Sequence, residues 1–191
     1  LALIAGATVI LLLYNGVGDG QGRFRDGEAA LRTTLFNVVS VMTGTGYAST
    51  DYGVWGPGSD SIFLILMFLG GCAGSAACGI KMFRLEISFR AALTYTQKMA
   101  HPRRVLPVRY AGRVVGEDTL QSVMVFVFLY LTVFVASAVL LGIVGLDPIT
   151  AISAAATSVS NVGPGLGPII GPAGTFQTLP DAAKWICIFN M

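Results

Sequence analysis

The run from Thr119 to Leu146 contains no charged side chain in 28 residues, and it constrains the fold of this chain strongly. About 20 consecutive apolar residues are enough for a helix to cross the roughly 30 Å hydrocarbon core of a bilayer, so the run predicts a membrane span. The whole composition points the same way, because 54% of the residues are hydrophobic and 12% are charged. That balance is far too apolar for a soluble domain, and we expect an integral membrane protein.

Three further apolar segments predict membrane helices. Leu1 to Val17 is uncharged and fits most of a span, Ser61 to Ile80 is uncharged over 20 residues, and Ala182 to Met191 begins another span. The chain starts and stops inside apolar runs, so we expect a fragment of a longer protein. No signal peptide is visible, since the first run lacks a basic start and a cleavage site.

Two apolar helical stretches of 12 residues, Leu31 to Met42 and Pro148 to Val159, are too short to span. Each is about 18 Å long at the usual rise and cannot cross a core of roughly 30 Å. Each also ends at a glycine-rich loop, so we predict that both helices enter the membrane and turn back. The C-terminal end of such a helix carries about half a negative charge, which favours a cation.

Both glycine-rich loops have the composition of a wall of a cation filter. Irregular backbone survives in hydrocarbon only where it lines a cavity, because each unpaired carbonyl group costs several kcal/mol. Glycine reaches positive φ without steric cost, so successive carbonyl groups can point the same way and replace the water around an ion. A plain surface turn is the alternative, and the flanking apolar segments argue against it. The predicted cation ligands, mainly backbone carbonyl groups, are Thr43, Gly44, Thr45, Gly46, Asn161, Val162 and Gly163.

The two halves of the chain form a repeat. A shift of 117 residues superposes the two short helices and aligns their loops, with Asn161 on Gly44 and Gly163 on Gly46. Each unit consists of a span, a re-entrant pore helix, a filter loop and a span, and both units face the same way. A potassium-like filter needs four such walls, and two are present. The predicted fold is therefore an all-α membrane protein built from tandem potassium-channel-like repeats.

The second half of the span Ser61 to Ile80 has almost no side-chain volume. Its Gly70-x-x-x-Gly74 pattern is typical of a close helix packing face. The alternative is a broken helix that lines the pore, because each glycine lowers helix stability by roughly 1 kcal/mol relative to alanine. Both interpretations stay open at this point. In the second one the segment forms a gate, whose residues are Gly70, Gly71, Gly74, Ser75 and Gly79.

The region Lys81 to Gly116 holds eight of the 12 basic residues of the chain against a single acid, Glu86. The positive-inside rule makes it a cytoplasmic loop and directs both filters toward the outside. Nucleic-acid binding is the competing interpretation, but no aromatic platform is interleaved with these charges and membrane spans flank the region. We therefore expect no nucleic-acid partner. The predicted organisation is a first repeat at 1–83, a cytoplasmic basic loop at 84–117 and a second repeat at 118–191.

The other reactive side chains predict neither catalysis nor a metal site. The three cysteines lie in apolar or small-residue segments without histidine or carboxylate neighbours at metal spacing, so we expect small buried side chains. His101 stands in a solvated basic connection. No acidic, basic or histidine side chain occurs in the runs Leu1 to Val17, Ser61 to Ile80 and Thr119 to Leu146, which argues against an enzyme and against a proton-relay transporter.

The most specific motifs are Asn161-Val162-Gly163-Pro164-Gly165-Leu166-Gly167, the small-residue run Gly70 to Lys81, and the segments Ala183 to Ile186 and Asn190 to Met191. With these motifs nearly the whole chain resembles the Trk/Ktr potassium-uptake superfamily, most closely the third and fourth repeats of its TrkH-type membrane subunit. The resemblance implies K⁺ as the transported ion, a gate in the small-residue run, and a cytosolic nucleotide-binding regulatory subunit of the TrkA type. It also implies a multi-pass protein of the bacterial inner (plasma) membrane, in contact with lipid, and we expect a homodimer.

The filter loops depart from the usual Thr-Val-Gly-Tyr-Gly sequence of tetrameric potassium channels, since only the central glycine, Gly46 or Gly163, is present in both units. Weaker rings of ligands select less sharply, so we expect a modest preference for potassium over sodium and passage of rubidium. A coupled cation symporter and a non-conducting membrane scaffold stay open as alternative functions.

Overall fold

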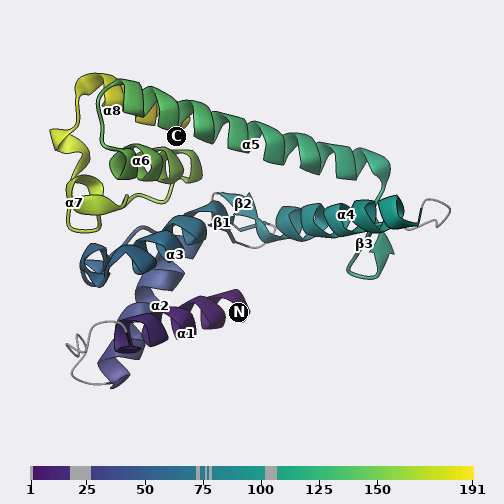
Figure 1. The fold of residues 1–191 in the computed structure, drawn as a ribbon, viewed down its shortest axis with the longest axis horizontal. Helices are drawn as coiled ribbons and strands as arrows, with labels where there is room; N and C mark the ends of the chain where they lie inside the picture. Colours follow the sequence, from purple (N-terminus) through teal and green to yellow (C-terminus); the bar gives the residue numbers. More distant parts are fainter. Residues whose placement is uncertain (1, 18–26, 72–73, 76, 78, 102–106) are drawn as a thin grey trace.

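The computed structural model describes residues 2–17, 27–71, 74–75, 77, 79–101 and 107–191, which are mostly helical (Figure 1). The elements of the first half are α1 (Ala2–Val17), α2 (Gly27–Thr43), η1 (Tyr52–Trp55), α3 (Pro57–Phe68), β1 (Leu69–Gly70), β2 (Ile80–Lys81) and α4 (Met82–Ala100). Those of the second half are β3 (Arg109–Tyr110), β4 (Arg113–Val114), α5 (Glu117–Ile143), α6 (Pro148–Ser160), α7 (Gly167–Ile170), η2 (Phe176–Thr178) and α8 (Asp181–Asn190). The predicted all-α class is confirmed, because the described strands are isolated two-residue pairs.

Helix α5 is the long element that runs along the upper edge of the molecule in Figure 1. Its 27 residues correspond to about 40 Å, and within the described ranges it is the one helix long and apolar enough to cross a membrane. Ala2–Asn15 and Pro57–Phe68 are shorter apolar helices. Phe128 and Ile143 of α5 are 68% and 76% exposed, which gives the helix the apolar outer surface that a bilayer requires.

Helix α6 joins two buried apolar clusters. In the first cluster α1, α2, α3 and η1 pack around Phe63, which stacks on Tyr52 with 4.1 Å between ring centroids. Ala156 of α6 belongs to this cluster as well. In the second cluster Ala154 and Ala155 lie on another side of α6, and their small side chains let α5 and α8 approach this helix closely.

The first short helix is longer than the predicted Leu31 to Met42, because α2 covers Gly27–Thr43. Its additional first turn contains Glu28, whose negative charge is favourable at a helix N-terminus. At 17 residues, or about 26 Å, α2 still falls short of a hydrocarbon core of roughly 30 Å. The second short helix, α6, ends one residue beyond the predicted Val159 and is otherwise as predicted.

The predicted span Ser61 to Ile80 is not a continuous helix. Helix α3 ends at Phe68, and Leu69 is extended with φ −84° and ψ 101°. The backbone of β1 then pairs in parallel with β2, so both ends of the small-residue run lie side by side. A continuous packing helix is therefore wrong for this segment, and the break agrees with the low helix propensity of its glycines. Its role as a gate stays a prediction.

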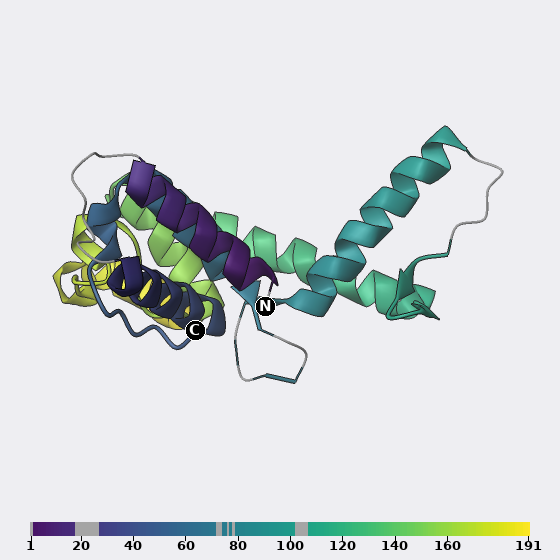
Figure 2. The same ribbon diagram turned by 90° about the horizontal axis from the view of Figure 1, so that it is seen from below.

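The basic segment predicted as a loop at 84–117 is folded over much of its length. Helix α4 takes up its first part, and the antiparallel pair β3 and β4 follows. Glu86 and Arg90 form an ion pair at 2.6 Å one turn apart, and Nη1 of Arg90 donates to the carbonyl oxygen of Arg109 at 2.8 Å. Charged side chains thus stabilise the helix and attach it to the pair of strands. Figure 2 shows α4 projecting away from the helices around α6.

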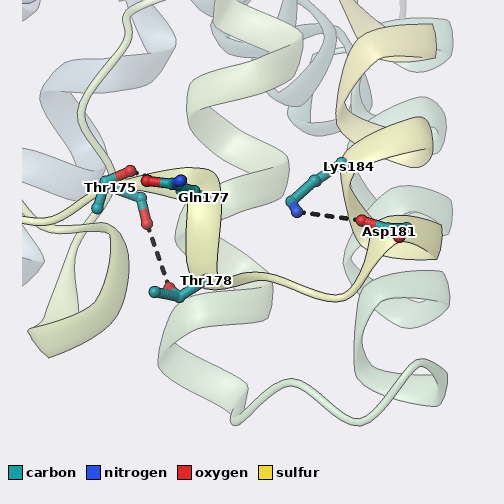
Figure 3. A network of polar contacts seen from close by, with 5 residues as sticks. All are labelled: Thr175, Gln177, Thr178, Asp181 and Lys184. Atoms are coloured by element: carbon teal, nitrogen blue, oxygen red, sulfur yellow. Dashed lines mark hydrogen bonds and ion pairs between the residues drawn. The ribbon is translucent and has the colours of Figure 1, made fainter.

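The connection from α7 to α8 is shaped by local polar contacts (Figure 3). Thr175 Oγ1 accepts from the N–H of Gln177 at 3.0 Å, and Thr178 Oγ1 donates to the carbonyl oxygen of Thr175 at 3.4 Å. Lys184 and Asp181 form an ion pair at 3.1 Å at the start of α8. Because this pair is largely exposed, we expect it to stabilise the fold by no more than about 1 kcal/mol.

Asp147 caps the N-terminus of α6, as its position before a proline predicts. Its Oδ2 accepts from the N–H of Thr150 at 3.1 Å, and the hydroxyl and N–H of Thr150 beside the carboxylate lower the pKa of Asp147 below its ordinary value. We expect Asp147→Ala to lower the free energy of unfolding by about 1 kcal/mol at neutral pH. Since the folded-state pKa is the lower one, this stabilisation is present above the unfolded-state pKa and is lost as pH falls through the folded-state value.

Thermal unfolding of the purified full-length protein measures this effect between pH 7 and pH 3. Asp147→Asn is the matched control, because asparagine caps helices without a titratable charge. We expect the Asn variant to keep most of the stability and to lose the acid-dependent part. An Ala variant as stable as the wild type at pH 7 would show that the cap contributes nothing.

Candidate functional site

The first glycine-rich loop leaves α2 through a tight turn. The N–H of Gly44 donates to the carbonyl oxygen of Val41 at 3.2 Å, and the N–H of Thr45 donates to that of Ser40 at 3.0 Å. The N–H of Gly46 shares the Ser40 carbonyl at 3.4 Å. Three successive N–H groups are thereby satisfied by the last turn of the helix, so the following carbonyl groups are free to face elsewhere.

The second loop leaves α6 in the same way. The N–H of Asn161 donates to the carbonyl oxygen of Ser158 at 3.2 Å, and the N–H of Val162 donates to that of Thr157 at 3.0 Å. The N–H of Gly163 donates to the hydroxyl of Thr157 at 2.9 Å. Each donor and the residue that accepts from it lie 117 positions after their counterparts in the first loop, so the hydrogen bonds of the two loops match at the predicted shift.

Backbone conformation also repeats between the loops. Gly44 and Asn161 have φ of 70° and 50°, and Gly46 and Gly163 have φ of 76° and 115°. Asn161 is one of two described non-glycine residues with positive φ, and asparagine tolerates the left-handed region better than most side chains do. The two loops therefore turn at the same two positions although their sequences share only the central glycine.

The two loops lie against each other. A Cβ atom on Gly46 would meet the carbonyl oxygen of Val162 and the ring of Pro164, and a Cβ atom on Gly163 would lie 3.7 Å from the Cα atom of Gly46. The structure thus brings together the predicted ligands of both loops. The two loops are neighbours, and the absence of a side chain at Gly46 permits their close approach.

Polar side chains inside the short helices hold the loops, and we did not predict their role from the sequence. Asn37 of α2 is fully buried, accepts from the N–H of Ser49 at 3.1 Å, and donates to the Ser49 hydroxyl at 3.2 Å. The hydroxyl groups of Thr43 and Thr45 lie 2.8 Å apart in the first loop. The sequence does contain a signal for this role, namely polar residues in an otherwise apolar helix, because buried polar groups need hydrogen-bond partners.

The predicted gate residues lie in a segment whose two ends are joined by hydrogen bonds. Beyond the β1 and β2 pair, the N–H of Met82 donates to the carbonyl oxygen of Gly71 at 3.3 Å, and Nζ of Lys81 donates to that of Ser75 at 3.2 Å. Gly74 and Gly79 have φ of 82° and 78°. Of the predicted gate residues, Gly70 is buried whereas Gly74 and Ser75 are exposed.

The described residues contain no group of three or more histidine, cysteine or carboxylate side chains that could hold a metal ion. Cys187 is buried and free, whereas Cys72 and Cys78 lie outside the residues that the structure describes. The predicted ligands are instead mainly the neutral backbone oxygens of the two loops. Such oxygens suit a weakly hydrated monovalent cation, as in potassium filters.

Comparisons with known proteins cover the whole chain. Residues 1–191 match the family model described as TrkH, cation transport protein. The chain is 43% identical over 191 residues to the Trk system potassium uptake protein TrkI of Halomonas elongata, and 29% identical over 191 residues to the Trk system potassium uptake protein TrkH of Salmonella typhimurium. In both cases 100% of this chain aligns with 38% of the relative, so it spans well under half of their length.

The fold is similar to the crystal structure of the potassium transporter TrkH from Vibrio parahaemolyticus. The TM-score is 0.84 at 29% sequence identity, and the match covers 100% of this chain and 40% of the other. The predicted family and potassium-channel-like fold class are confirmed, and the family consists of transporters and not of enzymes. The chain belongs to the TrkH family of cation transport proteins.

Proposed function

We propose that the full-length protein takes up potassium through a pore whose filter is built from four repeat loops, two of which are in this chain. The matched turns after α2 and α6, with positive φ at equivalent positions and a contact between Gly46 and Gly163, carry this proposal. The carbonyl groups of Thr43 to Gly46 and of Asn161 to Gly163 would replace the water around K⁺, which is the substrate. The similarity to Trk system potassium uptake proteins supports potassium as the ion.

The membrane arrangement is part of the same proposal. The protein would lie in the bacterial inner membrane with both filters toward the outside and the segment Lys81 to Gly116 in the cytoplasm. Gly70, Gly71, Gly74, Ser75 and Gly79 would belong to the gate below the filter. Two copies would form a homodimer. The predicted repeat boundaries, with the basic segment at 84–117, describe the same organisation.

Flux through the full-length protein in liposomes tests the function. We expect potassium and rubidium to pass and sodium to pass more slowly by a modest factor, without a requirement for a proton or sodium gradient. Uptake that stops when either gradient is removed would establish a coupled symporter. Empty-liposome rates for all three ions would establish a non-conducting scaffold. Each result contradicts the proposed pore.

We also propose that a cytosolic nucleotide-binding regulatory subunit of the TrkA type docks on the basic segment. Arg103 and Arg104 are two of its eight basic residues and lie outside the described residues. Reversing both to Glu should weaken co-purification of the regulator at low salt, because charges at the rim of an interface act over roughly one Debye length of about 10 Å at 0.1 M salt. Undiminished co-purification would leave these arginines with a topological role alone.

A further inference from the structure

Four aromatic side chains, Phe68, Phe126, Tyr130 and Phe134, form a cluster between the gate segment and the second filter loop. The Tyr130 ring lies 6.2 Å from the Phe68 ring, edge to face, and 6.1 Å from the Phe126 ring, stacked. Phe68 also meets Phe134 edge to face at 4.9 Å. Aromatic pairs in this range are attractive beyond their buried area, so the Phe68 ring links the end of α3 to α5.

The hydroxyl of Tyr130 reaches the second pore helix, where it shares a hydrogen bond with the hydroxyl of Ser160. Both side chains are buried, with 9% and 1% of their surface exposed. Ser160 is the last residue of α6 and directly precedes Asn161. The hydrogen bond therefore fixes the point at which the helix passes into the filter loop.

Both ends of the gate segment meet the aromatic cluster. Phe68 is the last residue of α3 and directly precedes β1. Arg84 lies in the first turn of α4, three residues beyond the end of β2, and its guanidinium group lies 4.0 Å from the centroid of the Phe126 ring. A cation over an aromatic face is attracted by it. A movement of the gate segment at either end thus displaces a neighbour of Tyr130.

The described residues of the first repeat contain no equivalent of this connection. The 117-residue shift places Leu13 at the position of Tyr130, and Leu13 is 61% exposed. It places Thr43 at the position of Ser160, and the Thr43 hydroxyl bonds within its own helix and loop, to the carbonyl oxygen of Val39 at 2.7 Å and to Thr45. The connection is therefore a specific feature of the second filter and not a property of the repeat.

We propose that Tyr130 is a positioning residue that couples the gate segment to the second filter loop. Its hydroxyl bonds Ser160 and so fixes the orientation of the carbonyl groups of Asn161 to Gly163. Its ring contacts Phe68 directly at one end of the gate segment, and contacts Arg84 at the other end through Phe126. This inference rests on the proposed function and adds to it that cation selectivity depends on a group outside the filter loops. It also predicts that the second filter loop depends on a hydrogen bond from outside the loop and that the first filter loop does not.

Tyr130→Phe in the full-length protein tests the hydroxyl, because it keeps the ring and its packing. We expect the permeability ratio of K⁺ to Na⁺ in liposomes to fall about threefold to tenfold, the range that one lost buried hydrogen bond allows. Ser160→Ala should give the same fall, the double variant no further fall, and Ser160→Thr should keep the ratio. Tyr130→Leu removes the ring as well and should also change total potassium flux.

The matched control is Thr132→Val, which removes a hydroxyl from the exposed side of the same helix, where it bonds the carbonyl oxygen of Phe128 at 2.8 Å. Hydrogen exchange of the peptide that contains Ser160 to Gly163 is a second measurement that does not need transport. We expect faster exchange in Tyr130→Phe than in Thr132→Val. Wild-type protein that passes no potassium would overturn the proposed function, and the exchange result would then decide the inference alone. Equal exchange, or an unchanged permeability ratio, in Tyr130→Phe and Thr132→Val would overturn the inference.

Discussion

Replacing Gly46 with alanine should reduce potassium uptake by the full-length protein at least about tenfold. The φ of Gly46 is 76°, and a side chain in the left-handed region costs about 1–2 kcal/mol. Its Cβ atom would also meet the carbonyl oxygen of Val162, one of the proposed ligands, and backbone cannot move aside as a flexible side chain does. The substitution therefore distorts the filter loops of both repeats, and we expect discrimination against sodium to fall together with the rate of potassium uptake.

Two other glycines serve as controls for this change. A Cβ atom on Gly163 would meet only the Cα atom of Gly46 at 3.7 Å, so Gly163→Ala carries the cost of its φ of 115° without the clash. Its effect should be the smaller one, and Gly163→Ser should lose uptake for the same reason. Gly142 in α5 has no atom near its Cβ position, so Gly142→Ala should leave uptake unchanged. Normal uptake and selectivity in Gly46→Ala would contradict the filter assignment.

The repeat and the turns of the filter loops could be predicted because they depend on local chemistry. Glycines at Gly44, Gly46 and Gly163 signal backbone that a side chain would strain, and a helix of 12 to 17 residues is too short to span whatever its tertiary contacts are. Asn161 fits the same rule, since it replaces a glycine at a position with positive φ. These features are set within a few residues along the chain.

Other features depend on contacts between distant segments, and periodicity does not reveal them. Helix α4 was expected to be a loop because its charges suggested a solvated connection, yet Glu86 and Arg90 pair along the helix and Arg90 also bonds β3. The bond between Tyr130 and Ser160 joins residues 30 positions apart. The pairing of β1 with β2 likewise brings together the two ends of a segment that the hydropathy pattern predicts as part of one continuous span. In each case the local structure depends on a residue that is distant in the sequence, and the sequence pattern does not identify that residue.

Deleting three residues, Ala73 to Ser75, should raise potassium flux through the full-length protein severalfold while selectivity stays unchanged. Met82 and Gly71 are tied by a backbone hydrogen bond, and Lys81 Nζ bonds the carbonyl oxygen of Ser75. The deletion shortens the segment between β1 and β2 and removes the acceptor of that lysine. Because the deleted residues belong neither to the filter loops nor to the contacts that Phe68 and Arg84 make with the aromatic cluster, the gate would open without a change of ligands. Liposome flux with potassium and sodium measures both quantities.

A pair of glycine substitutions separates a gate from a filter support. Gly74 and Gly79 have similar φ of 82° and 78°, so alanine at either position carries a similar strain. A Cβ atom on Gly79 would lie 3.2 Å from the carbonyl oxygen of Phe68 and 3.4 Å from the nitrogen of Gly70, whereas no atom of the described residues lies within 4 Å of the Cβ position of Gly74. Gly79→Ala should therefore loosen the junction of β1 and β2 and raise the open fraction more than Gly74→Ala does. If selectivity changed in either variant while the open fraction stayed fixed, the segment would support the filter and would not be a gate.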